Sequence, residues 1–113
     1  MSDRFKFRIY SFLEKSFYYF SIGDGEDGYP QGIAGGVSEI QQYTGLTDSN
    51  EKEIYEGDII EMTYDHIIER GFVVWENNSY ILKTIGEDSY APLVIFPKDK
   101  VIGNIFENKE LLK

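Results

Sequence analysis

The chain has 113 residues, of which 42% are hydrophobic and 16% aromatic, a composition that predicts one small domain with a packed core over residues 1–113. It contains no cysteine, which excludes disulfides, thiolate zinc sites and cysteine nucleophiles. The net charge of −9 is unevenly placed, because residues 23–69 carry twelve acidic side chains against one lysine. Phosphate backbones are bound by clustered Lys and Arg, so this charge disfavours nucleic acid as a partner.

The first residues show no targeting pattern. Residues 1–8 place charges where a signal peptide needs an apolar core, and no apolar run approaches the roughly 18 residues of a membrane span. We therefore expect a soluble, cytosolic protein with no membrane partner.

The first half of the chain predicts two strands, a long loop and a third strand. Residues 5–10 alternate apolar and charged side chains, which places Phe5, Phe7 and Ile9 on one face of a strand. The aromatic run 17–22 predicts a second strand, covered on both faces. Residues 23–36 hold six of the eleven glycines and predict an exposed loop, after which residues 37–43 resume extended structure.

The second half predicts a series of short strands. A polar turn at residues 48–50, with Asn50 left-handed, leads toward a strand over 59–64, which follows a tight turn or bulge at Gly57. The strands 71–75 and 79–83 flank Glu76-Asn77-Asn78 as a hairpin. Further strands are expected over 93–96 and 101–105, and a last helical turn over 108–112 with Asn108 as N-cap.

Strands that recur about every ten residues, with turn signals between them, indicate a sandwich or barrel. We expect a mainly-β protein in which the C-terminal two-thirds, from Ile54 onward, form a small SH3-like barrel. The N-terminal strands extend this barrel, and helix is limited to short turns.

Candidate chemical motifs are sparse, so we expect no cofactor, no metal and no enzyme activity. His66 is the only histidine, too few for a typical zinc site or for a supported catalytic triad, and a surface position is expected. The acidic stretch 24–28 lacks the ligand spacing of an EF-hand, and residues 32–36 lack the Lys and Ser/Thr of a phosphate-binding loop.

The segment Tyr55-Glu56-Gly57-Asp58 allows two interpretations. Its two carboxylates resemble an acid–base pair, which would need a cleft and a raised pKa. In the simpler interpretation Gly57 permits a turn and Asp58 accepts hydrogen bonds from nearby backbone amides. We favour the second, because turn chemistry explains all four residues.

Several segments together resemble the YopX family of phage and prophage proteins. They are residues 6–8, 42–46, 52–60, 71–75 and 101–108, and the family-motif positions within them are Tyr43, Thr44, Gly45, Tyr55, Glu56, Gly57, Asp58, Gly103 and Asn104. Family members usually carry Lys-Asn-Gly where this chain has Ser49-Asn50-Glu51, and proline where it has Lys109. The resemblance implies a phage or prophage origin, hence the host cytoplasm, and a mainly-β fold. It supplies no activity and no catalytic residues.

We expect a non-enzymatic module that binds an unidentified host or phage protein, with self-association through a strand edge as a further possibility. The candidate interaction surface comprises Glu53, Glu56, Asp58, Glu61 and Trp75. One alternative is a nucleic-acid-binding barrel that uses Arg4, Lys6 and Arg8 with aromatic side chains. Another is an acidic mimic of DNA phosphates that occupies a basic site on a nucleic-acid protein.

Overall fold

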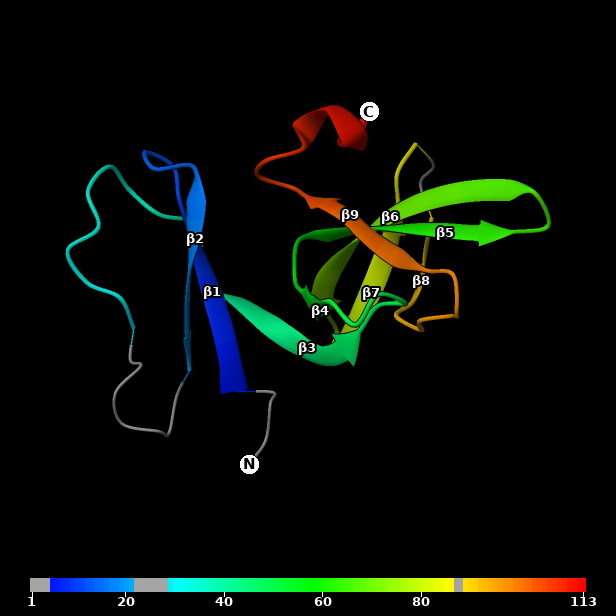
Figure 1. Ribbon diagram of the computed structural model, residues 1–113, viewed down its shortest axis with the longest axis horizontal. Helices are drawn as coiled ribbons and strands as arrows, with labels where there is room; N and C mark the ends of the chain where they lie inside the picture. The colour runs from blue at the N-terminus through cyan, green and yellow to red at the C-terminus, as the bar shows by residue number, and fades with distance from the viewer. Residues whose placement is uncertain (1–4, 22–28, 87–88) are drawn as a thin grey trace.

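The computed structural model describes residues 5–21, 29–86 and 89–113, and within them the prediction of a mainly-β protein is confirmed. Two sheets lie side by side (Figure 1). The N-terminal sheet has the order β2-β1-β3-β4, and the C-terminal sheet has the order β8-β7-β6-β5-β9. The N-terminal strands are β1 (Lys6–Ser11), β2 (Ser16–Ser21), β3 (Gln41–Thr47) and β4 (Glu53–Tyr55). The later elements are β5 (Asp58–Tyr64), β6 (Ile67–Glu76), β7 (Ser79–Thr84), β8 (Tyr90–Pro92), β9 (Lys100–Asn104) and the 3₁₀ helix η2 (Lys109–Leu112).

The N-terminal sheet begins as a hairpin and buries both faces of β1. Strand β1 pairs with β2 from Lys6 opposite Ser21 to Ser11 opposite Ser16. Ile9 is 1% exposed, and on the opposite face Arg8 is 3% exposed, so the charged positions of β1 do not all face solvent. Because β2 lies at the sheet edge and Tyr19 is 60% exposed, the prediction that this strand is covered on both faces was wrong.

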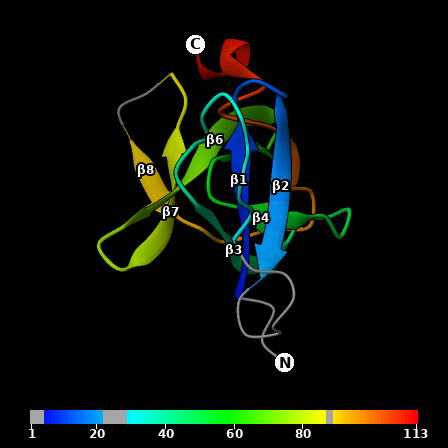
Figure 2. The same ribbon diagram turned by 90° about the vertical axis from the view of Figure 1, so that its left-hand side faces the viewer.

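Two antiparallel hairpins with two-residue turns, β5–β6 and β6–β7, form the centre of the C-terminal sheet. Asn77 and Asn78 both have positive φ (52° and 65°), the backbone of a type I′ turn, and the predicted β6–β7 hairpin is confirmed. Asp65 and His66 form an equivalent turn between β5 and β6, with φ of 47° and 64°. His66 is exposed there, as expected. Figure 2 shows the β6–β7 hairpin extending past the N-terminal sheet.

The turn between β3 and β4 differs from the prediction at one residue. Glu51, not Asn50, has the left-handed backbone, with φ of 63°. Asp48 organises the turn, because its Oδ1 accepts the N–H groups of Asn50 (2.8 Å) and Lys52 (2.9 Å). Glu51 also donates its backbone N–H to the Asp48 carbonyl, which closes the turn at this position.

One C-terminal prediction was wrong, and another is confirmed only in part. Residues 93–96 are not a strand, although Leu93 and Ile95 pack against the core, because the Phe96 N–H bonds to the Asp99 carboxylate instead of a sheet neighbour. The last turn is present as η2, but Asn108 makes no side-chain cap. Its Oδ1 instead accepts the Asn104 N–H at 3.0 Å.

The main apolar core joins the two sheets. Four fully buried side chains form it, and they are Ile54, Ile60, Val73 and Leu82. Ile54 comes from β4 of the N-terminal sheet and the others come from the C-terminal sheet, so the core fixes β4 against β5, β6 and β7. Strands β8 and β9 stand at the two ends of the C-terminal strand order, and the SH3-like barrel stays a prediction.

Candidate functional site

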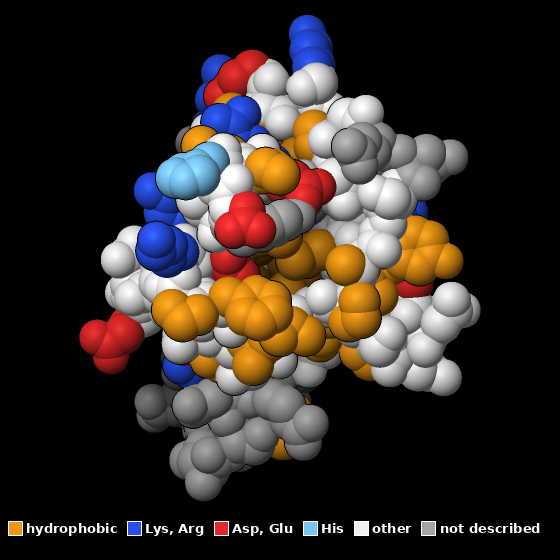
Figure 3. All heavy atoms as spheres, turned by 90° about the vertical axis from the view of Figure 1, so that its right-hand side faces the viewer, with side chains coloured by type: hydrophobic (Ala, Val, Ile, Leu, Met, Phe, Trp, Pro, Cys, Tyr) orange, Lys and Arg blue, Asp and Glu red, His pale blue; other side chains and the backbone are white. Residues whose placement is uncertain are grey.

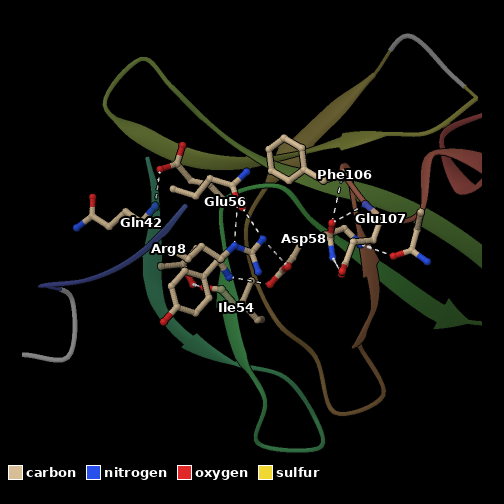
Figure 4. A network of polar contacts seen from close by, with 12 residues as sticks. Arg8, Gln42, Ile54, Glu56, Asp58, Phe106 and Glu107 are labelled. Carbon is tan, nitrogen blue, oxygen red and sulfur yellow. Dashed lines mark hydrogen bonds and ion pairs between the residues drawn. The ribbon is translucent and has the colours of Figure 1, made fainter. Parts of the chain in front are cut away.

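Arg8 lies at the centre of a buried polar cluster between the sheets, which we call the Arg8 junction (Arg8, Gln41, Glu56 and Asp58; Figure 4). Its Nη2 donates to Asp58 Oδ1 at 2.8 Å and to the Glu56 carbonyl at 3.0 Å. Its Nε donates to Gln41 Oε1 at 2.8 Å. These acceptors come from β3, from the turn before β5 and from β5 itself, so one guanidinium joins segments far apart in the sequence.

Aromatic rings enclose the same guanidinium. The Arg8 Cζ lies 4.1 Å from the centroid of Phe17 and 4.9 Å from that of Tyr55, within the range of cation–π attraction. Burial raises the pKa of Tyr55, with nearby Glu53 adding to the effect, so its hydroxyl stays protonated. The rings exclude water from the Arg8–Asp58 pair, whose side chains are only 4% and 3% exposed.

The segment Tyr55-Glu56-Gly57-Asp58 forms the turn between β4 and β5, which confirms the turn interpretation. Gly57 has φ of 86°, and a Cβ there would collide with the side-chain amide of Gln41. Asp58 Oδ2 accepts the Tyr55 N–H at 2.8 Å. Burial raises the pKa of Asp58 above its ordinary value, although Arg8 and the Tyr55 N–H stabilise the carboxylate.

Glu56 is half-buried at the edge of this junction. Its Oε1 accepts the Gln42 N–H at 2.9 Å. Burial raises the pKa of Glu56, and Glu39 raises it further, against the opposing effects of the Gln42 N–H and Arg8.

The family-motif positions in β3, namely Tyr43, Thr44 and Gly45, contribute to packing and to the pairing of β3 with β4. Tyr43 is 5% exposed and packs on Tyr55, with ring centroids 5.5 Å apart. The Thr44 hydroxyl donates to the Ile54 carbonyl at 2.8 Å, and Gly45 lies where the β3–β4 register shifts.

The Gly103-Asn104 pair shapes the end of β9. A Cβ at Gly103 would lie 2.5 Å from Asn108 Oδ1, so only glycine fits beneath that side chain. Asn104 Oδ1 accepts the N–H groups of Phe106 (3.0 Å) and Glu107 (2.9 Å). Both residues thus build the turn that carries Phe106 toward β1.

The predicted interaction surface is only partly exposed. Asp58 is 2% exposed, so its assignment to that surface was wrong. It forms a buried ion pair with Arg8 instead. Glu53 bonds to Lys6 at 2.6 Å. Glu61 lies 3.5 Å from Arg70 and 3.8 Å from Lys100. Trp75 is 50% exposed, which leaves half of its surface accessible to a partner.

Of the basic side chains named for nucleic-acid binding, the two that the structure describes, Lys6 and Arg8, are both engaged within the chain. Lys6 is ion-paired with Glu53, and Arg8 is buried. Arg4 lies outside the described residues, as does the acidic stretch 24–28. Among the described residues, no group of His, Cys, Asp and Glu is arranged to hold a metal, and no helix is long and apolar enough to span a membrane.

A groove of about 670 Å³ lies where the two sheets meet, and we call it the inter-sheet groove. Its apolar lining includes Phe12, Ile40 and Trp75, each 50% exposed. Phe106 adds a ring that stacks on Tyr10 at 4.9 Å. Its acidic lining is Glu39, Glu56 and Glu76, and its described lining residues include no Lys, Arg or His.

A second apolar surface lies on the other side of the molecule. Figure 3 shows hydrophobic side chains gathered on the face that is on the right in Figure 1. The end of the β5–β6 hairpin and the chain between β8 and β9 lie there, and they carry the exposed side chains Ile67, Val94 and Phe96.

The sequence analysis missed the Arg8 junction and the inter-sheet groove. A signal for the junction was present, because Arg8 and Asp58 both lie in segments that carry the family resemblance. The groove had no such signal. It is lined by residues from the turn after β1 to the turn after β9, and only the sheet packing brings them together.

Comparison with known proteins gives a family and a fold. A family model described as YopX protein matches residues 3–113. A crystal structure of protein EF1440 from Enterococcus faecalis is similar over 96% of this chain and 97% of its own, with a TM-score of 0.57 and 24% sequence identity. At that identity the likeness concerns the fold alone. No curated protein matches the sequence.

Proposed function

The chain belongs to the YopX family, and from this membership together with the inter-sheet groove we propose that it is a non-enzymatic protein-interaction module. It acts in the cytoplasm of a phage-infected or lysogenic host cell. Its scaffold is the C-terminal sheet, folded as a small SH3-like barrel, and its partner is a host or phage protein.

The observation that carries this proposal is the exposed aromatic and aliphatic lining of the groove. Phe12, Ile40 and Trp75 come from three separate segments, yet they line one groove and each is half exposed. Trp is enriched among the residues that dominate protein–protein binding, because it offers a large rigid area at small entropic cost. Apolar side chains gathered in one hollow on a small domain are typical of a binding surface.

The alternatives gain less support from the geometry. A nucleic-acid interface needs free cations, but Lys6 bonds to Glu53 and Arg8 is enclosed by rings. A phosphate mimic needs a displayed row of carboxylates. The four carboxylates of the candidate interaction surface are each engaged within the chain, since Glu53, Glu61 and Asp58 are ion-paired and Glu56 accepts a backbone N–H.

Affinity purification with two matched variants tests the proposal. Tagged wild-type chain, Trp75→Ala and Phe96→Ala are expressed in infected host cells, and recovered proteins are quantified. Phe96 is the control, because it is 63% exposed and does not line the groove. We expect a protein that is recovered with the wild type and with Phe96→Ala, depleted about tenfold or more with Trp75→Ala, and rebound by the purified chain.

Two results would overturn the proposal. One is recovery of the same proteins by all three chains, which would place binding elsewhere or show it to be nonspecific. The other is tight binding of oligonucleotides at low salt without any protein partner, which would favour the nucleic-acid alternative.

A further inference from the structure

The inter-sheet groove has an unbalanced charge. Glu39, Glu56 and Glu76 line it, and its described lining residues include no cation. Glu76 is ion-paired with Lys83 at 2.8 Å, whereas Glu39 is exposed and has no ion-pair partner among the described residues. The nearest buried cation, Arg8, is committed to Asp58. The groove therefore presents a negative field that the described part of the chain neutralises only in part.

The groove lining mixes apolar residues with these carboxylates. Trp75 precedes Glu76 on β6, and Ile40 follows Glu39 ahead of β3. The Trp75 ring packs edge-on against Tyr80, with centroids 4.7 Å apart, and half of its surface stays exposed. An exposed indole face attracts cations as well as apolar groups. The groove thus combines carboxylates and exposed apolar side chains in one lining.

Resting on the proposed function, we propose that the groove binds a cationic–apolar segment of the partner protein, in which Lys or Arg stands beside an aliphatic or aromatic residue. The apolar side chain lies on Phe12, Ile40 and Trp75. The cation lies near Glu39 and Glu56, the two carboxylates of the lining that make no ion pair among the described residues.

The charges argue against other occupants of the groove. A second copy of this chain carries a net charge of −9 and would meet the same negative field. Nucleic acid would be repelled for the same reason. An acidic peptide could place its apolar side chain in the groove only next to unpaired carboxylates, a like-charge arrangement that weakens binding.

Three sets of short fluorescent peptides test the inference. Each peptide carries one aliphatic or aromatic residue flanked by Lys or Arg, by Glu, or by Ser, and binding to the full chain is followed by fluorescence anisotropy. We expect the cationic set to bind at least about tenfold more tightly than the acidic set, with the neutral set between them. Raising the salt from about 0.01 M to about 1 M shortens the screening length from about 30 Å to about 3 Å and should remove most of this preference.

Two carboxylate variants and one control locate the cation. Glu39→Gln and Glu56→Gln should each weaken the cationic peptides about two- to fivefold and leave the neutral peptides unchanged, as expected for partly exposed charge pairs. Glutamine keeps an acceptor for the Gln42 N–H, so the fold is preserved at position 56. The control Glu110→Gln removes an exposed charge on η2 that does not line the groove and should change neither set.

The outcomes separate this inference from the proposed function. Equal binding of the three peptide sets, each lost in Trp75→Ala, would overturn the cationic partner but keep the groove as a protein-binding site. Two outcomes would overturn both proposals. One is binding by all three peptide sets that persists in Trp75→Ala. The other is no binding by any set, together with a purified chain that recovers no partner whose binding depends on Trp75.

Discussion

Two buried regions hold this small protein together, and they differ in chemistry. The Arg8 junction joins β1 to β3 and β5 through one guanidinium with three hydrogen-bond acceptors, all at 2.8–3.0 Å. The apolar core around Ile60 joins β4 to the C-terminal sheet through side chains that make no directional bonds. The first region fixes geometry and the second contributes burial energy, so they should respond differently to substitution.

The two regions should differ because the Arg8 junction contains buried charges, whereas the apolar core contains none. A buried ion pair gains little over a well-packed apolar replacement, but removing one partner leaves the other charged and desolvated. Apolar contacts have no such partner, and their loss scales with the surface and volume removed. The Arg8 junction should therefore be intolerant of single changes, whereas the core should respond in graded steps.

The largest effect is expected for Arg8→Met. This change leaves the Asp58 carboxylate without its cation at 3% side-chain exposure, and we expect the free energy of unfolding to fall by about 3–5 kcal/mol. Urea unfolding at neutral pH measures it. The double variant Arg8→Met/Asp58→Asn should recover more than half of the loss, because asparagine removes the charge and keeps an acceptor for the Tyr55 N–H. A double variant as unstable as the sum of the two single variants would show that the pair is not coupled.

The core should respond in proportion to the volume removed. Ile60 is fully buried, and Ile60→Ala should lower the free energy of unfolding by about 3 kcal/mol, whereas Ile60→Val should lower it by about 1 kcal/mol. The matched conservative change in the other region, Arg8→Lys, loses the forked geometry and should lower it by more than Ile60→Val does. Equal losses for the two conservative changes in the same urea titrations would remove the distinction between the regions.

Asp48 tests whether any buried carboxylate behaves like Asp58. It is 6% exposed, but backbone N–H groups satisfy it instead of an arginine, including that of Val101 in β9 at 2.9 Å. Burial tends to raise its pKa, yet the N–H groups of Val101, Lys52 and Asn50 outweigh burial and hold the pKa of Asp48 below its ordinary value of 3.8.

Asp48→Asn should lower the free energy of unfolding by about 1–2 kcal/mol at neutral pH, since an amide oxygen accepts fewer bonds and its NH₂ faces donors. A lowered pKa stabilises the fold above the unfolded value, and this contribution is lost as pH falls through the folded value. The difference between wild type and variant should therefore shrink below about pH 4. The pH dependence of the Asp58 contribution to stability has the opposite sign, because burial raises the pKa of Asp58. Urea titrations from neutral pH to pH 3 measure the difference, and a pH-independent gap would contradict the assignment for Asp48.

The sequence predicted the strands and turns well because these depend on local patterns. The β6–β7 hairpin follows from Asn77 and Asn78 between β-branched and aromatic runs, and the turn before β5 follows from Gly57. Residues 93–96 have the composition of a strand but lie in a loop: the Leu93 N–H still bonds to the Tyr80 carbonyl of β7 at 3.3 Å, whereas the Phe96 N–H bonds to the Asp99 carboxylate. Local composition does not distinguish the two cases.

The candidate site was harder to predict because it depends on long-range contacts. The alternating pattern of β1 placed Arg8 toward solvent. In the structure Arg8 is instead buried and bonded to Asp58, fifty positions later in the sequence. Trp75 was named for the interaction surface and is half exposed, but nothing near it in the sequence indicates Phe12 or Ile40 as fellow lining residues of one groove. The sequence motif singled out Asp58 as a residue of interest. Its role as the partner of Arg8 could not be predicted, because only the fold brings the two residues together.

The smallest expected effect concerns a turn outside both regions, where a single backbone angle decides the sign. Glu51 has φ of 63°, a strained conformation for a residue with a Cβ. Glu51→Gly should raise the free energy of unfolding by about 0.5–1 kcal/mol, because relief of strain exceeds the added entropy of the unfolded chain. The matched change Asn50→Gly meets no positive φ and also weakens the turn, so it should lower the free energy by a similar amount. If thermal unfolding showed that both variants change the free energy of unfolding in the same direction, backbone strain at Glu51 would not explain the effect. The stability of the turn would then have to be explained through the hydrogen bonds of Asp48 alone.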